Sequence, residues 1–205
     1  MSPTRLTRSE KAQERREAIV EAATAEFVAN GFAATRIEDI AARAGVAKGT
    51  VYLNFADKRD LFESVVKTRM LPIVATIGAG FERAHDTVRE TVEALLDVAL
   101  PLLSEPRTGD ILRLVVSESI RFPDLTGFYR REVIGPTAAR MGGLLKRAAA
   151  AGELTTPAAA DYPLLVVAPL ILAIVANGRL QEVGVTDMRA MLRTHLDGLF
   201  AGRRS

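Results

Sequence analysis

The 205-residue sequence contains no cysteine. A chain without cysteine can form no disulfide framework, no thiolate nucleophile and no cysteine-ligated zinc site, and this composition fits a reducing compartment. The N-terminal region carries arginine and lysine among polar residues and lacks the apolar core of a secretory signal. We therefore expect a cytoplasmic protein.

Long apolar runs are also absent. The longest nearly uncharged stretch, Pro163 to Ala176, contains two prolines and is shorter than the roughly 20 apolar residues that a membrane span needs. We expect this stretch to form a buried helix, and we expect no membrane partner. With 48% hydrophobic and 25% charged residues the chain should fold around a packed core, whereas its net charge of +2 is too small to argue for nucleic acid.

The sequence lacks the motifs of common catalytic and metal sites. There is no G-x-S-x-G elbow, no phosphate-cradling glycine loop and no pair of histidines at metal-ligand spacing. Gly78-Ala79-Gly80 lacks the third glycine of a dinucleotide loop and follows no predicted strand. We interpret His85 and His195 as packing or capping residues. We therefore expect no enzymatic activity, no metal and no cofactor.

Helical patterns recur along the whole chain, whereas alternating strand patterns and hairpin turns are missing. We predict an all-α fold of about nine helices, divided into a three-helix domain at 1–60 and a larger helical domain at 61–205. The first helix is expected from about Ser9 to Asn30, because Ile19, Ala23 and Phe27 lie on one helical face. A left-handed cap at Gly31 should end it.

Two short helices are predicted next. The run Thr35-Arg36-Ile37-Glu38 matches a capping box, so the second helix should start at Arg36 and stop at Gly45. A third helix, about Lys48 to Phe55, follows after three residues, and Asp57 should cap a fourth helix from Lys58. Two short helices joined by such a turn form a helix-turn-helix.

The third helix has an outward face that fits DNA. Val51 and Phe55 lie four residues apart and are expected to bury together, which turns a polar set outward. Leu53 is apolar on this half-exposed helix, so it either meets a thymine methyl or flanks the core. Such a helix suits the major groove. Two alternatives are an ordinary helical hairpin and a helical interaction protein that binds a protein or membrane surface.

The segment from about Glu14 to Phe62 resembles the DNA-binding domain of the TetR family of bacterial transcriptional regulators. The resemblance rests on the joint spacing within IVEAATAEFVANGFAATRIEDIAARAGVAKGTVYLNFADKRDLF. It implies a homodimer whose helical C-terminal half binds an effector, and it implies DNA contacts by Thr35, Arg36, Lys48, Gly49, Thr50, Tyr52, Asn54 and Lys58. Thr35, Tyr52 and Lys58 would hold phosphates. The sequence departs from many relatives at Ala47, where they have serine or threonine.

The resemblance also implies a repressor that a small apolar or amphipathic molecule releases from its operator. Bundles often hold ligands between helices, so we expect an effector site in the larger domain. The candidate lining residues are Leu96, Val116, Ser119, Phe128, Tyr129, Met141 and Tyr162.

The last two predicted helices, about Pro157 to Glu182 and Thr186 to Ala201, carry more apolar surface than one bundle needs to cover. We expect them to form a two-fold dimer interface, with an inverted-repeat operator in double-stranded DNA as its consequence. The candidate interface residues are Leu172, Val175, Met188, Leu192, Leu196 and Leu199.

Overall fold

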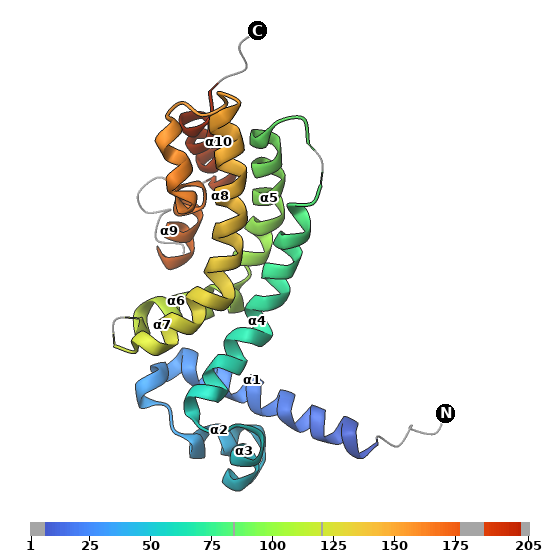
Figure 1. Cartoon of the computed structure of the whole chain (residues 1–205). Helices are drawn as coiled ribbons and strands as arrows, with labels where there is room; N and C mark the ends of the chain where they lie inside the picture. The colour runs from blue at the N-terminus through green and yellow to red at the C-terminus, as the bar shows by residue number, and fades with distance from the viewer. Residues whose placement is uncertain (1–6, 84, 120, 177–186, 202–205) are drawn as a thin grey trace. The chain divides into compact units, whose positions relative to one another are not determined.

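The computed structural model describes residues 7–83, 85–119, 121–176 and 187–201 (Figure 1). Within these ranges the regular structure is helical, apart from an isolated bridge between Leu154 and Phe200. The all-α fold is therefore confirmed. No helix of the described ranges has the length and hydropathy needed to span a membrane.

The chain divides into two compact units. The first comprises Met1–Arg69 and Leu114–Thr126, and the second comprises Met70–Arg113 and Gly127–Ser205. Helices α4 (Lys58–Gly80) and α6 (Pro106–Glu118) contribute residues to both units. The boundary at residue 60 stays a prediction.

The first unit contains α1 (Arg8–Ala34), α2 (Ile37–Ala44), α3 (Lys48–Asn54) and the start of α4. A capping box begins α1, because the Glu10 N–H donates to Thr7 Oγ1 at 3.2 Å and the Glu10 carboxylate accepts from the Thr7 N–H at 2.6 Å. The core of the unit is aromatic, with the rings of Phe27, Phe32 and Phe62 at centroid distances of 5.3 to 5.7 Å. This packing fixes α1 against α4.

Two predicted helix boundaries in this unit, one end and one start, are confirmed. Gly45 ends α2 in the left-handed conformation, with φ 69°, and its N–H bonds to the last carbonyls of the helix. Asp57 caps α4, because its carboxylate accepts a hydrogen bond from the Asp60 N–H at 2.8 Å. The third helix also lies where the sequence predicted it, since α3 spans Lys48–Asn54.

The predicted capping box at Thr35 is wrong. Helix α2 begins at Ile37, and its N-cap residue Arg36 makes no side-chain cap bond. The Thr35 hydroxyl lies 2.7 Å from the Gly31 carbonyl and 3.1 Å from the Glu26 carbonyl, so it is used at the end of α1. Those carbonyls compete successfully with the N–H groups of α2 for the threonine.

Gly31 interrupts α1 rather than ending it. Its φ of 75° is positive, and helical geometry returns for the residues up to Ala34. A β-carbon at position 31 would also lie 2.7 Å from Glu118 Oε1. The positive φ is what favours glycine at this position, and a side chain there would also make the Glu118 carboxylate shift.

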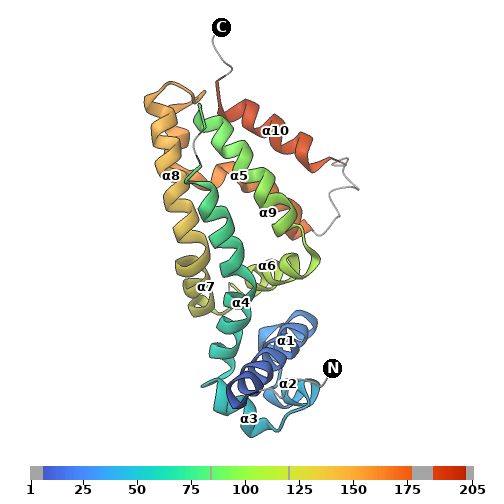
Figure 2. The same cartoon turned by 90° about the vertical axis from the view of Figure 1, so that its right-hand side faces the viewer.

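The second unit is a helical bundle. It contains α5 (Val88–Leu103), a π-helical turn at Arg130–Ile134, α8 (Gly135–Ala150), α9 (Ala168–Ala176) and α10 (Met188–Leu199). Helix α7 (Pro123–Tyr129) runs directly into the π-helical turn and α8, and counting the three as one gives nine helices in the described ranges. The two views in Figures 1 and 2 show α5 and α8 side by side, with Leu95, Leu144 and Leu145 buried.

The predicted helix from Pro157 to Glu182 is interrupted. Two 3-10 turns, Pro157–Asp161 and Pro163–Val166, precede α9, and residues 177–182 lie outside the described ranges. The prolines explain the difference, because proline supplies no N–H for an α-helical bond. The last predicted helix is shorter than expected, since Asp187 caps α10 at Met188 and the helix ends at Leu199.

Candidate nucleic-acid interface and ligand-binding region

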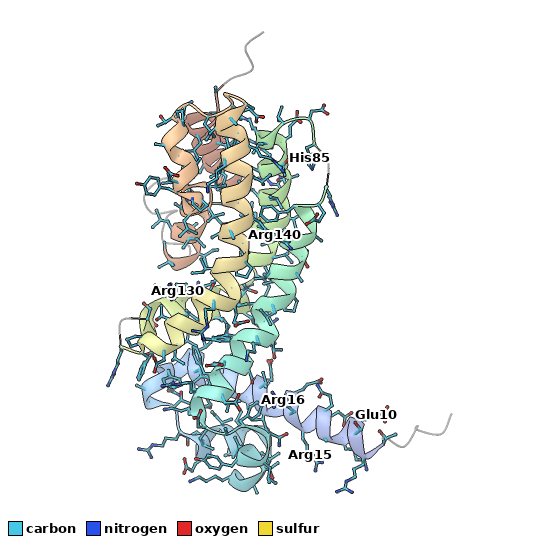
Figure 3. All side chains as sticks on the ribbon, viewed as in Figure 1. Glu10, Arg15, Arg16, His85, Arg130 and Arg140 are labelled. Atoms are coloured by element: carbon cyan, nitrogen blue, oxygen red, sulfur yellow. The ribbon has the colours of Figure 1, made fainter. Side chains whose placement is uncertain are left out.

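Helix α3 is held by its buried side. Val51 and Phe55 are almost fully buried, as their spacing predicted. The C-terminal end of α3 is held by Arg16, labelled in Figure 3, whose guanidinium donates to the Asn54 carbonyl at 2.9 Å and to Ser64 Oγ at 3.3 Å. The same guanidinium lies 4.3 Å from the centre of the Phe55 ring. The orientation of α3 is therefore fixed.

Five of the predicted DNA-binding residues lie together on this helix. Lys48, Gly49 and Tyr52 are exposed, whereas Thr50 and Asn54 are half-buried. The Asn54 amide donates to the Thr50 carbonyl at 2.8 Å. Helix α3 contains no acidic residue, so its exposed side carries nothing that would repel phosphate.

Lys48 is paired with a carboxylate of α2. Its ammonium donates to Glu38 Oε1 at 2.5 Å and lies 5.9 Å from the centre of the Tyr52 ring. The hydrogen bond to Glu38 raises the pKa of Lys48, and the same bond lowers the pKa of Glu38. Both side chains are exposed, so water and salt screen this pair.

The other three predicted DNA-binding residues lie at the junction of α1, α2 and α4. Thr35 is 2% exposed, and its hydroxyl is bonded within the chain, so it offers no donor to a phosphate. Lys58 donates to the carbonyls of Ala33, at 3.2 Å, and Thr35, at 2.9 Å. Burial lowers the pKa of Lys58. Arg36 is exposed at the start of α2.

Two side-chain pairs were missed from the sequence. One is Arg16 with the end of α3, and the other is the buried Glu26, which accepts from Arg43 Nε at 2.6 Å and from the Asn30 amide at 2.9 Å. Arg16 falls on the same helical stripe as Ile19 and Phe27, which is a signal that it faces the core.

The structure does not gather the seven predicted effector-binding residues around one described cavity. Leu96 lines a pocket of about 390 Å³ between α5 and α10, together with charged residues such as Arg89 and Asp197. The others lie elsewhere: Phe128, Tyr129 and Met141 are buried, Val116 and Tyr162 are exposed, Ser119 is half-buried, and Val116 and Ser119 belong to the first unit. Burial raises the pKa of the Tyr129 phenol.

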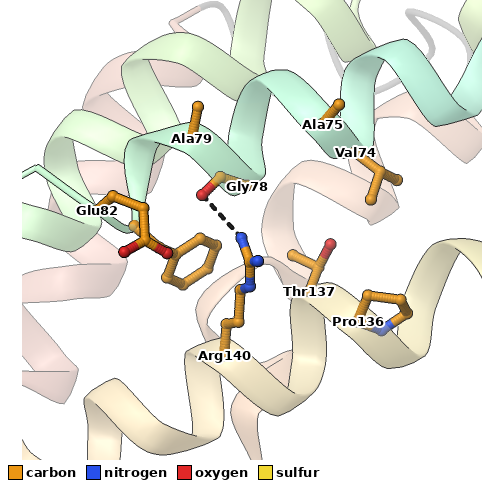
Figure 4. Close-up of a pocket in the computed structure, with 9 residues that line it drawn as sticks. Val74, Ala75, Gly78, Ala79, Glu82, Pro136, Thr137 and Arg140 are labelled. Atoms are coloured by element: carbon orange, nitrogen blue, oxygen red, sulfur yellow. Dashed lines mark hydrogen bonds between the residues drawn. The ribbon is translucent and has the colours of Figure 1, made fainter.

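A second pocket, of about 310 Å³, lies between α4 and α8 (Figure 4). Val74, Ala75 and Ala79 supply apolar groups from α4, and the Arg140 side chain reaches from α8 toward Gly78. Arg140 Nη1 donates to the Gly78 carbonyl at 2.8 Å. This site combines apolar surface with one cation and the carboxylate of Glu82, in a part of the second unit that the sequence did not indicate.

The six predicted dimer residues differ in their exposure. Leu192 and Leu196 are buried within the chain itself, so they present no surface to a partner. Leu172 and Val175 on α9 are exposed, and Leu172 is 58% exposed. Met188 and Leu199 are half-buried. The correction follows from packing, because the apolar stripe of α10 is covered by its own bundle.

Comparison with known proteins decides the family. Residues 19–65 match the family model described as bacterial regulatory proteins, tetR family, and residues 83–195 match the tetracyclin repressor-like C-terminal domain. The chain belongs to the TetR family. The resemblance seen in the sequence is thereby confirmed, and this TetR-family protein is a DNA-binding transcriptional regulator.

Relatives and solved structures agree with this assignment. The transcriptional repressor BepR of Brucella suis biovar 1 (strain 1330) is 28% identical over 176 residues, which cover 84% of this chain and 82% of BepR. The transcriptional regulator SrpR of Pseudomonas putida is 37% identical over 89 residues, covering 42% of this chain and 40% of SrpR. The structure of a SmeT–triclosan complex is 25% identical, covers 91% of both chains and has a TM-score of 0.69. SmeT represses the multidrug efflux pump SmeDEF of Stenotrophomonas maltophilia.

Proposed function

We propose that this TetR-family protein is a cytoplasmic, homodimeric repressor that binds an inverted-repeat operator through α3 and leaves it when a small apolar or amphipathic molecule binds to the second unit. The observation that carries the proposal is the fixed orientation of α3. Its buried Val51 and Phe55 turn Lys48, Gly49 and Tyr52 to the surface. A short helix presented in this way fits the major groove.

Within this interface the residues have different roles. Base edges can be reached by the α3 side chains and by the exposed backbone of its glycine. The residues concerned are Lys48, Gly49, Thr50 and Asn54. Tyr52 and Arg36 are exposed and supply a hydroxyl and a guanidinium for phosphates. Lys58 donates two of its three ammonium protons to the carbonyls of Ala33 and Thr35 and keeps one for a phosphate.

Selection of bound duplexes from random DNA tests this part of the proposal. The expected product is an inverted repeat whose half-site centres lie about one helical turn, roughly 34 Å, or somewhat more apart. Recovery of unrelated sequences with no inverted repeat would contradict the proposed operator.

The effector proposal is supported by the chemistry of the second unit and by the relatives. The pocket between α4 and α8 offers apolar carbons, the Arg140 guanidinium and the Glu82 carboxylate to an amphipathic molecule. SmeT, which shares the fold over 91% of both chains, forms a complex with triclosan. Triclosan, a small apolar phenol, is therefore a reasonable first probe for a panel of such molecules.

Linkage gives the experiment for the effector. A molecule that releases DNA must bind less tightly to the DNA-bound protein, with a coupling of about 1 to 3 kcal/mol. Calorimetric titration of triclosan and related phenols, with and without the selected duplex, measures this difference. Equal affinity in both titrations for every molecule that binds would exclude the coupling.

The dimer proposal rests on exposed apolar residues around α9. Leu164, Ile171, Leu172 and Val175 are all exposed on this helix and the 3-10 turn before it. A cluster of this kind on one element is typical of an interface. Leu172→Glu should produce a monomer in sedimentation experiments, whereas Val28→Glu, at an exposed valine of α1, should stay dimeric. A dimeric Leu172→Glu protein would place the interface elsewhere.

A further inference from the structure

Leu53 is the most exposed large apolar side chain among the described residues, at 87%, compared with 49% for Tyr52 beside it. The sequence left open whether Leu53 flanks the core. This exposure excludes that role, because the side chain gains almost no burial within the chain. A single exposed leucine is ordinary on a protein surface, so its position decides what it means.

The position of Leu53 follows from the helix. It lies two residues from the buried Val51 and two from the buried Phe55, which is about 200° around an α-helix from each. Leu53 therefore lies opposite the side that holds α3 to the core. Any surface that meets α3 face-on meets this side chain.

The turn before Leu53 leaves it uncovered. Side chains on a helix lean over the preceding turn, so Leu53 leans toward Gly49 and Thr50. Gly49 has no side chain, and a β-carbon built there would have no neighbour within 4 Å. The apolar side chain of Leu53 is therefore left open to any surface that meets this side of α3, and α3 contains no acidic residue.

We propose that Leu53 reads the 5-methyl group of one thymine in each half-site of the operator. Thymine is the base that presents a methyl group in the major groove, and aliphatic side chains recognise that group by apolar contact. Because the chain is a DNA-binding regulator of the TetR family, and because α3 itself carries no carboxylate, we take DNA rather than a protein partner as the occupant of this face. This inference rests on the proposed function of α3.

Replacing thymine by deoxyuridine removes only the methyl group and tests the contact directly. In the duplex selected by the wild-type protein, each thymine of a half-site is replaced in turn. At one position the change should weaken wild-type binding by about fourfold per half-site, the value of one buried methyl-sized group. Leu53→Ala should bind the unmodified duplex more weakly and show no loss at that position.

Two further variants control the experiment. Leu53→Asn keeps a side chain of similar shape but polar, and it should also lose the methyl effect. Val28→Ala changes an exposed valine on α1, 38% exposed, and should give the wild-type deoxyuridine profile. All three variants should stay folded and unfold close to the wild-type temperature, because none of the changed side chains belongs to the buried core.

The outcomes separate the inference from the function beneath it. If the protein selects an inverted repeat but every deoxyuridine duplex affects the wild type and Leu53→Ala equally, the methyl contact is refuted while the proposed function stands. If no sequence is selected at all, both the proposed function and the thymine contact are refuted.

Discussion

The carboxylate of Glu118 accepts a hydrogen bond from the backbone N–H of Phe32 at 2.9 Å. Gly31 leaves room for the carboxylate in this position, since a β-carbon there would lie 2.7 Å from the same oxygen. The Phe32 ring also meets Phe122 edge-on, with centroids 4.9 Å apart. Residues at the end of α6 are thereby attached to the break in α1, within the first unit.

Glu118→Ala should destabilise the first unit. The change leaves the partly buried Phe32 N–H without its charged acceptor, and the expected loss in the free energy of unfolding is about 1 to 3 kcal/mol. Glu118→Gln keeps a neutral acceptor and should lose less. Urea denaturation measures both, and a Glu118→Ala midpoint equal to that of wild type would show that the bond contributes nothing.

Arg16→Ala should also lower stability and loosen α3. It removes two hydrogen bonds and a contact with the Phe55 ring, with an expected cost of about 1 to 3 kcal/mol. The exposed neighbour Arg15 is a matched control, and Arg15→Ala should stay within about 0.5 kcal/mol of wild type. Equal unfolding curves for the two variants would contradict the role given to Arg16.

Much of the first unit could be predicted because its signals are local. The stop at Gly45, the cap at Asp57 and the burial of Val51 with Phe55 each depend on residues within one or two helical turns. The partners of Arg16 and Glu118 could not be predicted in this way. They lie 38 and 86 positions away in the sequence, where no spacing rule applies.

The errors have the same physical origin. The Thr35–Glu38 pattern fits a capping box, but both side chains found partners outside the motif, on α1 and on Lys48. The apolar stripe of α10 was predicted to face a partner, yet Leu192 and Leu196 are covered by their own bundle. A helical stripe shows that a face is buried, not what buries it.

Glu38→Gln should strengthen DNA binding. In the free protein the Glu38 carboxylate holds the Lys48 ammonium, and it also adds negative charge beside the face proposed to meet phosphates. Removing the Glu38 charge should raise the affinity for the selected duplex by up to about fivefold at low salt. Asp39→Asn removes the same charge from the next residue and is the control, because no bond joins Asp39 to Lys48 in the described structure. Titrations at several salt concentrations compare the two, and an equal gain would assign the effect to net charge alone.

The alkaline stability of the protein should depend on Tyr129. Burial raises the pKa of its phenol above the usual 10.0, so the folded chain keeps the proton that the unfolded chain loses. The protonated phenol contributes fully to the free energy of unfolding below pH 10.0. This contribution is lost as the pH rises toward the pKa of Tyr129 in the folded chain. Tyr129→Phe should make the alkaline decline less steep, whereas Tyr162→Phe, at an exposed tyrosine, should follow wild type. Denaturation across this pH range measures the free energy of unfolding. An equal decline for the wild type, Tyr129→Phe and Tyr162→Phe would contradict the expectation.

The central claim, that α3 reads the operator, is tested most directly by comparing the DNA sequences selected by the wild type and by Lys48→Ala. The account predicts an inverted repeat for the wild type and the same repeat for the variant with relaxed preference at one position in each half-site, costing about 1 to 3 kcal/mol there. Thr50→Ala and Asn54→Ala should each relax a position of their own. An unchanged motif in all three variants would contradict base reading by this helix.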